Sequence, residues 1–159
     1  IGKTEGHLDQ SIFSREVLNE KKGPPPEINL FNEKNNGETV LSLIKKNLIK
    51  SAHDVSLGGI ITALAKMCIK GKIGIKIKKP NYLINQFEYL FGEDQGRYIV
   101  EIEKNDYKKV IEILNKSSVH YDELGIVTEK DMIIDDRSKV SIDELIKSNN
   151  TWLTNYMSK

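Results

Sequence analysis

The apolar pattern changes its period at Gly71, and this change constrains the fold more than any other feature of the sequence. Before Gly71, apolar residues recur at helical spacing on one face, namely Ile60, Ile61, Leu64, Met67 and Cys68. After it, Ile73, Ile75 and Ile77 alternate with polar or small residues, which is typical of a half-buried strand. We therefore expect a helix that is stopped by Gly71 at its C-terminal end and is followed at once by a strand with a basic outer face.

Further short helices and strands are interleaved along the chain. Helical spacing covers residues 11–18, the segment from Phe31 onward, 85–89, 107–114 and 142–146, and strand-like runs cover 49–52, 98–103, 124–127 and 132–134. In the helix from Phe31 the predicted stripe is Val40, Leu41, Ile44 and Leu48, and Asn36-Gly37 either starts or interrupts this helix. Because hairpin-like and helical connections are mixed, an α+β layered fold is expected, with a mixed β-sheet and packed helices.

Length and composition limit the organisation and the partners. The 159 residues fit a single domain over 1–159, and Pro24–Pro26 predict a rigid connection inside it, because the residues before them are too few for a separate core. Lys plus Arg (24) nearly balances Asp plus Glu (23), so no nucleic-acid partner is expected. One cysteine and no membrane-spanning apolar run predict a cytoplasmic protein without membrane contact. The start at Ile1, without Met, predicts a cut from a longer chain or a processed start.

The polar turn His53–Gly59 is the first candidate site. It lies between a strand-like run and the strongest helix, and the paired glycines Gly58 and Gly59 would let a ligand or another backbone approach closely. Asp54 can bind a hydroxyl or a metal-bound water, and Ser56 is well placed to cap the helix. The alternative is structural: His53 and Asp54 orient a tight turn, and Ser56 serves only as the cap.

The turn Glu93-Asp94-Gln95, between Gly92 and Gly96, is the second candidate. Two carboxylates and an amide before a strand can bind ribose hydroxyls, ammonium groups or a hydrated Mg²⁺. The alternative is a solvated acidic turn in which Arg97 is the local counter-charge.

Other polar residues are given structural interpretations. His7 and Asp9 lie close together in sequence, yet a catalytic base needs an oriented nucleophile and none is evident. Asp9 is therefore interpreted as the N-cap of the helix that follows. Cys68, on an apolar stripe, is interpreted as a core thiol.

These turns, in this order, resemble one family. Four segments together resemble phosphoribosylformylglycinamidine synthases. They are Thr4-Glu5-Gly6-His7-Leu8 with Gln10-Ser11, Pro24–Pro26 before Asn29-Leu30, Ser51–Ser56 with Gly58-Gly59, and Leu90–Arg97. The match is to the last domain of the synthetase subunit, in the superfamily that includes aminoimidazole ribonucleotide synthetase. It covers essentially the whole chain, up to the tail from Trp152. The absence of a glutaminase domain after the tail makes the chain similar to the small, multi-subunit form.

The resemblance implies a function for the parent protein. It would be an ATP-dependent carbon–nitrogen ligase that converts formylglycinamide ribonucleotide to formylglycinamidine ribonucleotide with ammonia from glutamine, in purine biosynthesis. Its cofactors would be ATP and Mg²⁺. Its partners would be the upstream domains of the same chain, a glutaminase subunit and a small accessory subunit. The family's catalytic His and principal Mg²⁺ carboxylates lie upstream, so no catalytic or metal residue, no tightly held cofactor and no activity are expected of this chain alone.

The same resemblance supplies the cleft residues. The two turns face a cleft between paired domains in the family, which makes His53, Asp54, Ser56, Gly58, Gly59, Glu93, Asp94 and Gln95 nucleotide- or substrate-cleft candidates. Two departures suggest a degenerate copy of the site: Leu57 stands where the family usually has Asp, and Asp9 where it usually has Gly. A selenophosphate or thiamine-phosphate enzyme of the superfamily remains one alternative, and a nonenzymatic nucleotide-binding or interaction module is the other.

Overall fold

The computed structural model describes residues 1–135 and 138–158, and the chain divides into two compact units. Unit 1 comprises Ile1–Ala63 and Tyr82–Asp122, and unit 2 comprises Leu64–Asn81 and the chain from Glu123 onward. Helix α3 (Gly59–Gly71) begins in unit 1 and continues in unit 2. This division does not decide the expectation of one domain over 1–159, which stays a prediction.

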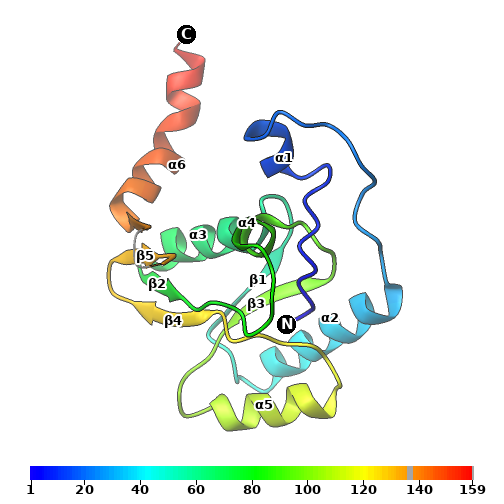
Figure 1. The fold of residues 1–159 in the computed structure, drawn as a ribbon. Helices are drawn as coiled ribbons and strands as arrows, with labels where there is room; N and C mark the ends of the chain where they lie inside the picture. The colour runs from blue at the N-terminus through cyan, green and yellow to red at the C-terminus, as the bar shows by residue number, and fades with distance from the viewer. Residues whose placement is uncertain (136–137, 159) are drawn as a thin grey trace. The chain divides into compact units, whose positions relative to one another are not determined.

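Unit 1 combines a two-stranded ribbon with helices. Strand β1 (Ser51–Val55) pairs antiparallel with β3 (Arg97–Glu101), so that Val55 lies opposite Arg97. The helices are α1 (Ile12–Glu16), α2 (Leu30–Lys45), α4 (Gln86–Phe91) and α5 (Tyr107–Lys116). Helices α2 and α5 lie side by side (Figure 1). The core they share contains Leu43, Val110, Leu114 and Val119.

Unit 2 contains the larger sheet. Its strands β2 (Gly74–Ile77), β4 (Gly125–Thr128), β5 (Asp131–Ile133) and β6 (Lys139–Ser141) lie in the order β4-β2-β5-β6. The β2–β5 pair is parallel and the other two pairs are antiparallel, so the sheet is mixed. Helix α6 (Ile142–Met157) follows β6 directly, with a capping box between Ser141 and Glu144. The expected α+β fold with a mixed sheet and packed helices is confirmed.

The predicted stripe of α2 is right for Val40 and wrong for Leu41 and Ile44. Asn36, Thr39, Val40 and Leu43 are buried, whereas Leu41 and Ile44 are 47% and 48% exposed. Two polar residues belong to the inner face, and Asn36 donates a hydrogen bond from Nδ2 to the Gly96 carbonyl at 2.9 Å. A prediction that counts only apolar residues therefore assigns part of the wrong face of the helix to the core. Asn36-Gly37 does not interrupt the helix either, since both residues lie within α2.

The ends of several elements differ from the sequence expectations. His53 and Asp54 belong to β1 and not to a turn, because backbone pairing with β3 extends to Val55. Gly71 is the last residue of α3, but the left-handed residue that ends the helix is Lys72, at φ +53°. Strand β6 was not predicted. Helix α6 extends well beyond the predicted 142–146.

The start of α1 corrects the interpretation of Asp9. Ser11 is the N-cap, and its hydroxyl oxygen accepts a hydrogen bond from the Ser14 N–H at 3.1 Å. In the described part of the chain, no helix combines the length and the apolar character that a membrane crossing requires.

Candidate functional site

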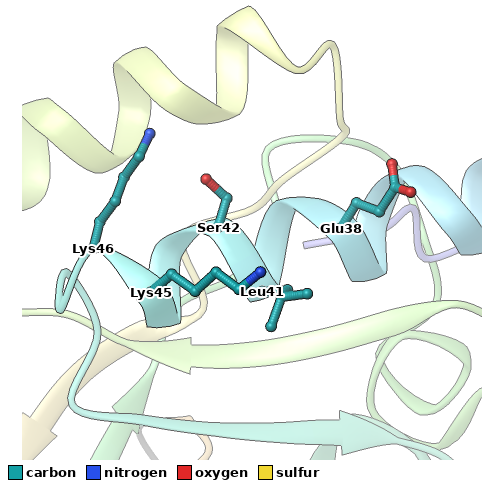
Figure 2. A pocket seen from close by; sticks show the side chains of 5 residues that line it. All are labelled: Glu38, Leu41, Ser42, Lys45 and Lys46. Atoms are coloured by element: carbon teal, nitrogen blue, oxygen red, sulfur yellow. The ribbon is translucent and has the colours of Figure 1, made fainter.

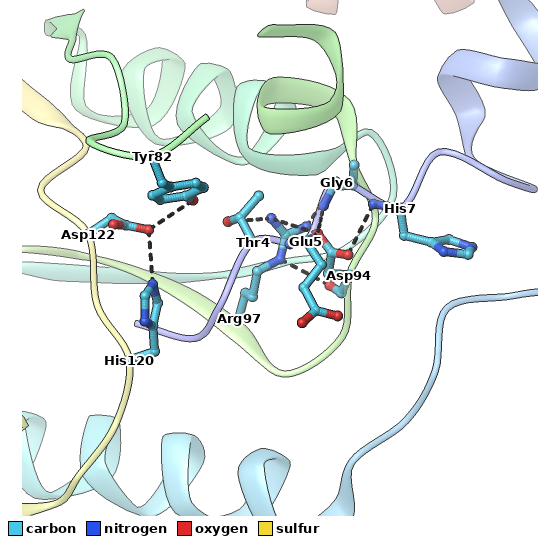
Figure 3. Close-up of polar contacts among 10 residues, drawn as sticks. Thr4, Glu5, Gly6, His7, Tyr82, Asp94, Arg97, His120 and Asp122 are labelled. Atoms are coloured by element: carbon cyan, nitrogen blue, oxygen red, sulfur yellow. Dashed lines mark hydrogen bonds and ion pairs between the residues drawn. The ribbon is translucent and has the colours of Figure 1, made fainter. Parts of the chain in front are cut away.

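Asp94, in the loop between α4 and β3, binds the N-terminal segment of the chain. Its Oδ2 accepts hydrogen bonds from the backbone N–H groups of Glu5 and Gly6 at 3.2 and 3.1 Å, and its Oδ1 accepts one from the His7 N–H at 3.1 Å (Figure 3). Successive N–H groups that converge on one carboxylate form an anion-binding nest. Here the anion is a side chain of the same polypeptide, only 8% exposed.

Arg97, the first residue of β3, completes this network. It is 3% exposed, and its Nε donates to the Asp94 carbonyl at 3.1 Å and its NH2 to the Gly92 carbonyl at 2.6 Å. NH1 donates to Thr4 Oγ1 at 3.2 Å and lies 3.6 Å from Asp94 Oδ2. Burial lowers the pKa of Arg97, while the Asp94 carboxylate opposes this shift. A guanidinium remains protonated in either case, so the carboxylate is its buried counter-charge.

Glu93 joins the second turn to the first. Its Oε1 accepts hydrogen bonds from the Ile12 N–H and the Gly58 N–H, each at 2.8 Å. These donors lie at the start of α1 and directly before α3, where unpaired N–H groups and the helix dipole favour a negative charge. Glu93 also donates its own N–H to the His7 carbonyl at 2.8 Å. The two predicted turns are thus neighbours, held together by one carboxylate.

The paired glycines have left-handed backbone conformations, and Gly59 also permits a close approach of another segment of the chain. Gly58 and Gly59 have φ of +82° and +69°, a region that favours glycine. A Cβ at Gly59 would lie 2.6 Å from the Leu90 carbonyl oxygen and 2.8 Å from that of Gly92. Ser56 is not the cap that the sequence suggested: α3 begins at Gly59, and Ser56 contributes its backbone carbonyl to the Gly59 N–H at 3.0 Å.

The remaining candidates have side chains that reach solvent. Asp54, Ser56 and Gln95 are exposed and His53 is half-buried. The His53 ring nitrogen Nδ1 lies 2.6 Å from the Asp54 carbonyl oxygen and 3.5 Å from its carboxylate. The eight candidates therefore fall into two groups: Gly58, Gly59, Glu93 and Asp94 are buried, whereas the other four can meet a ligand or another domain.

The N-terminal segment is the part that sequence reasoning missed. Thr4, Glu5, Gly6 and His7 carry part of the family resemblance, but they were not predicted to be partners of Asp94 and Arg97. Gly6, at φ +83°, was the available signal, since a backbone nest needs such a residue. His7 also binds the proline-rich connection, with Nε2 at 3.0 Å from the Pro24 carbonyl oxygen.

The donor set of the two turns does not fit a Mg²⁺ site. Oε1 of Glu93 already accepts two N–H groups and the two oxygens of Asp94 accept three, so these buried carboxylates are engaged by the chain's own donors and do not form an open set of oxygen ligands. Within residues 1–135 and 138–158, no group of three or more His, Cys, Asp or Glu side chains is placed to share a metal ion.

The fold and these turns define a class of protein. Residues 6–136 match the family described as AIR synthase related protein, C-terminal domain. This match covers most of the sequence, so the chain belongs to that family.

The chain is also similar to individual relatives that share one name. The chain is 74% identical over 99% of its length to the phosphoribosylformylglycinamidine synthase subunit PurL of Pelagibacter ubique, and covers 22% of that protein. It is 38% identical over its whole length to PurL of Bartonella henselae, again covering 22%. The chain thus spans about a fifth of the length of these relatives.

Solved structures agree on the fold. Thermotoga maritima PurL complexed with FGAR superposes with a TM-score of 0.70 at 22% identity, covering 84% of this chain and 24% of that one. PurLQS from T. maritima gives a TM-score of 0.62 at 23% identity, with the same coverage of each chain.

Proposed function

We propose that this chain is the C-terminal domain of the synthetase subunit of a phosphoribosylformylglycinamidine synthase. The parent protein would use ATP and ammonia derived from glutamine to convert formylglycinamide ribonucleotide to formylglycinamidine ribonucleotide, in de novo purine biosynthesis. The observation that carries this proposal is the 74% identity to P. ubique PurL across 99% of the chain. Because the chain spans 22% of that relative, the reaction is assigned to a longer protein and not to these residues alone.

In this proposal the domain supplies one wall of a cleft. Glu93 and Asp94, with Arg97 behind them, fix the backbone of the two turns, and Gly58 and Gly59 allow those turns to pack closely. His53, Asp54, Ser56 and Gln95 would then face the nucleotide, the substrate or the opposite wall. Their exposure supports this assignment, as does the engagement of the buried carboxylates with the chain's own N–H groups.

The cofactors and partners follow from the same proposal. T. maritima PurL is known as complexes with ATP, AMPPCP and ADP, which supports ATP as the nucleotide of the parent. The Mg²⁺ ligands would come from other domains of the longer chain, because the two turns offer no free pair of carboxylates. PurLQS of T. maritima supports a complex with glutaminase and small accessory subunits. We propose the cytoplasm as the location of this complex.

Helix α2 offers one surface for packing against the rest of the longer chain. Its exposed side carries Leu30, Phe31, Leu41 and Ile44, between 47% and 78% exposed. A hollow of about 400 Å³ lies on the same helix (Figure 2), lined by Glu38, Leu41, Ser42, Lys45 and Lys46. Exposed apolar groups of this kind mark interaction surfaces. Since about four fifths of the relatives' length lies outside this chain, we assign this surface to a contact with that part.

Removing exposed cleft groups should impair the reaction without unfolding the protein. In the full-length protein, Asp54→Ala with Ser56→Ala should lower kcat/KM for formylglycinamide ribonucleotide about tenfold, the effect of one or two lost hydrogen bonds. Stability should change by less than about 0.5 kcal/mol, because both side chains are exposed. Steady-state kinetics and thermal melts measure the two effects. Glu112→Ala, an exposed carboxylate on α5, is the matched control, and an equal loss there would contradict the assignment.

Calorimetric titration separates the proposal from the alternatives. The isolated chain should bind ATP, ADP and formylglycinamide ribonucleotide weakly or not at all, because the opposite wall of the cleft is missing. A nucleotide-sensing module would bind one of the nucleotides tightly without any other domain. Tight binding by the isolated chain would therefore favour that second function.

A further inference from the structure

Tyr89, on α4, buries a hydroxyl group that the described chain does not satisfy. The residue is 3% exposed, and Tyr89 Oη has no hydrogen-bond partner among residues 1–135 and 138–158. Buried polar side-chain atoms almost always have a partner, from the protein or from ordered water. A buried phenol left without one costs about 1–3 kcal/mol. We therefore expect the Tyr89 hydroxyl to donate to an acceptor that does not belong to the described residues.

The surroundings of Tyr89 are polar on one side. Its ring meets that of Tyr82 edge-on, with centroids 6.4 Å apart. Tyr82 Oη donates to Asp122 Oδ2 at 3.2 Å, and His120 Nε2 lies 3.4 Å from the same oxygen (Figure 3). Burial raises the pKa of Tyr89, and the Asp122 carboxylate adds to this shift. Tyr89 is thus a protonated donor that lies within the electrostatic reach of an acceptor carboxylate.

We propose that an internal water molecule occupies the space between Tyr89 and the Tyr82–Asp122 pair, accepting from Tyr89 Oη and donating to the Asp122 carboxylate. A buried water needs a polar site with two to four partners. The phenol of Tyr89, the carboxylate of Asp122 and the phenol of Tyr82 supply three. A bridging water is nearly as favourable in enthalpy as a direct hydrogen bond. It links α4 to residues 120–122, which the chain separates by the whole of β3 and α5.

The Tyr89→Phe variant tests whether the Tyr89 hydroxyl has a hydrogen-bond partner. In the full-length protein, loss of a water-bridged hydroxyl should lower the hydrogen-exchange protection of the amides in α4 by about three- to tenfold, the effect of one net hydrogen bond. If the hydroxyl had no partner, phenylalanine would remove its desolvation cost, and protection would stay the same or rise. Either of these results overturns the proposal. Tyr82→Phe, which removes a hydrogen bond seen directly, calibrates the size of the loss.

A crystal structure of the full-length protein gives the second, independent readout. Electron density for a water within about 3.2 Å of Tyr89 Oη and within reach of Asp122 is expected in the wild type and absent, or displaced, in Tyr89→Phe. Density for no water, or a protein group from another domain in its place, would overturn the proposal.

Discussion

Asp94→Ala should lower the free energy of unfolding by about 3–5 kcal/mol, the usual cost of removing one partner of a buried ion pair. The substitution leaves the Arg97 guanidinium, 3% exposed, without its counter-charge. It also leaves the N–H groups of Glu5, Gly6 and His7 without their acceptor, and each such group adds to the cost. Urea denaturation followed by circular dichroism measures the loss.

Two further variants test the reason for that loss. Asp94→Asn keeps one acceptor oxygen and the shape of the side chain but removes the charge, so it should lie between the wild type and Asp94→Ala. Gln95→Ala, at an exposed position of the same loop, should change stability by less than about 0.5 kcal/mol. An Asp94→Ala protein as stable as Gln95→Ala would show that the carboxylate does not hold the N-terminal segment.

Glu93→Ala is expected to lower the free energy of unfolding by about 2–6 kcal/mol, the cost of two unpaired buried donors. The variant removes the acceptor of the Ile12 and Gly58 N–H groups, both at 2.8 Å, and each buried donor left unpaired costs about 1–3 kcal/mol. Ile12 is the first residue of α1 and Gly58 directly precedes α3, and the loss of their acceptor should also appear as faster hydrogen exchange at these two amides. Glu93→Gln is the matched control, since Oε1 is kept and only the charge is lost. Equal exchange at Gly58 in the alanine and wild-type proteins would contradict the bridging role.

The spacing of apolar residues predicted which segments form helices and strands better than it predicted which face of each is buried. The change at Gly71 correctly separated α3 from β2, because one helix face and one strand face are buried in ways that apolar residues report directly. The buried face of α2 was misplaced, because Asn36 and Thr39 belong to it and no apolar count includes them. His53 and Asp54 were placed in a turn for the same reason, although Asp54 lies on the exposed face of β1, which tolerates a polar side chain, and His53 is only half-buried on the opposite face.

The sequence likewise predicted some features of the candidate site and missed others. The two turns that the sequence singled out are neighbours in the structure, but nothing in the sequence indicated that Asp94 binds residues 5–7, some 87 to 89 positions away. That contact depends on the path of the N-terminal segment, which carries no periodic pattern. Arg97 was expected to be a local counter-charge, and its pairing with Asp94 is confirmed. The two carboxylates of the turn are buried and not solvated, since Arg97 and backbone N–H groups replace water around them, whereas Gln95 is exposed.

The most direct test of the proposed function is turnover by the isolated chain beside turnover by the full-length protein. Both would be supplied with formylglycinamide ribonucleotide, ATP, Mg²⁺ and ammonium chloride, after circular dichroism has shown that residues 1–159 are folded. The proposal predicts amidine formation by the full-length protein and none by the isolated chain. Turnover by the isolated chain, or an inactive full-length protein, would contradict it.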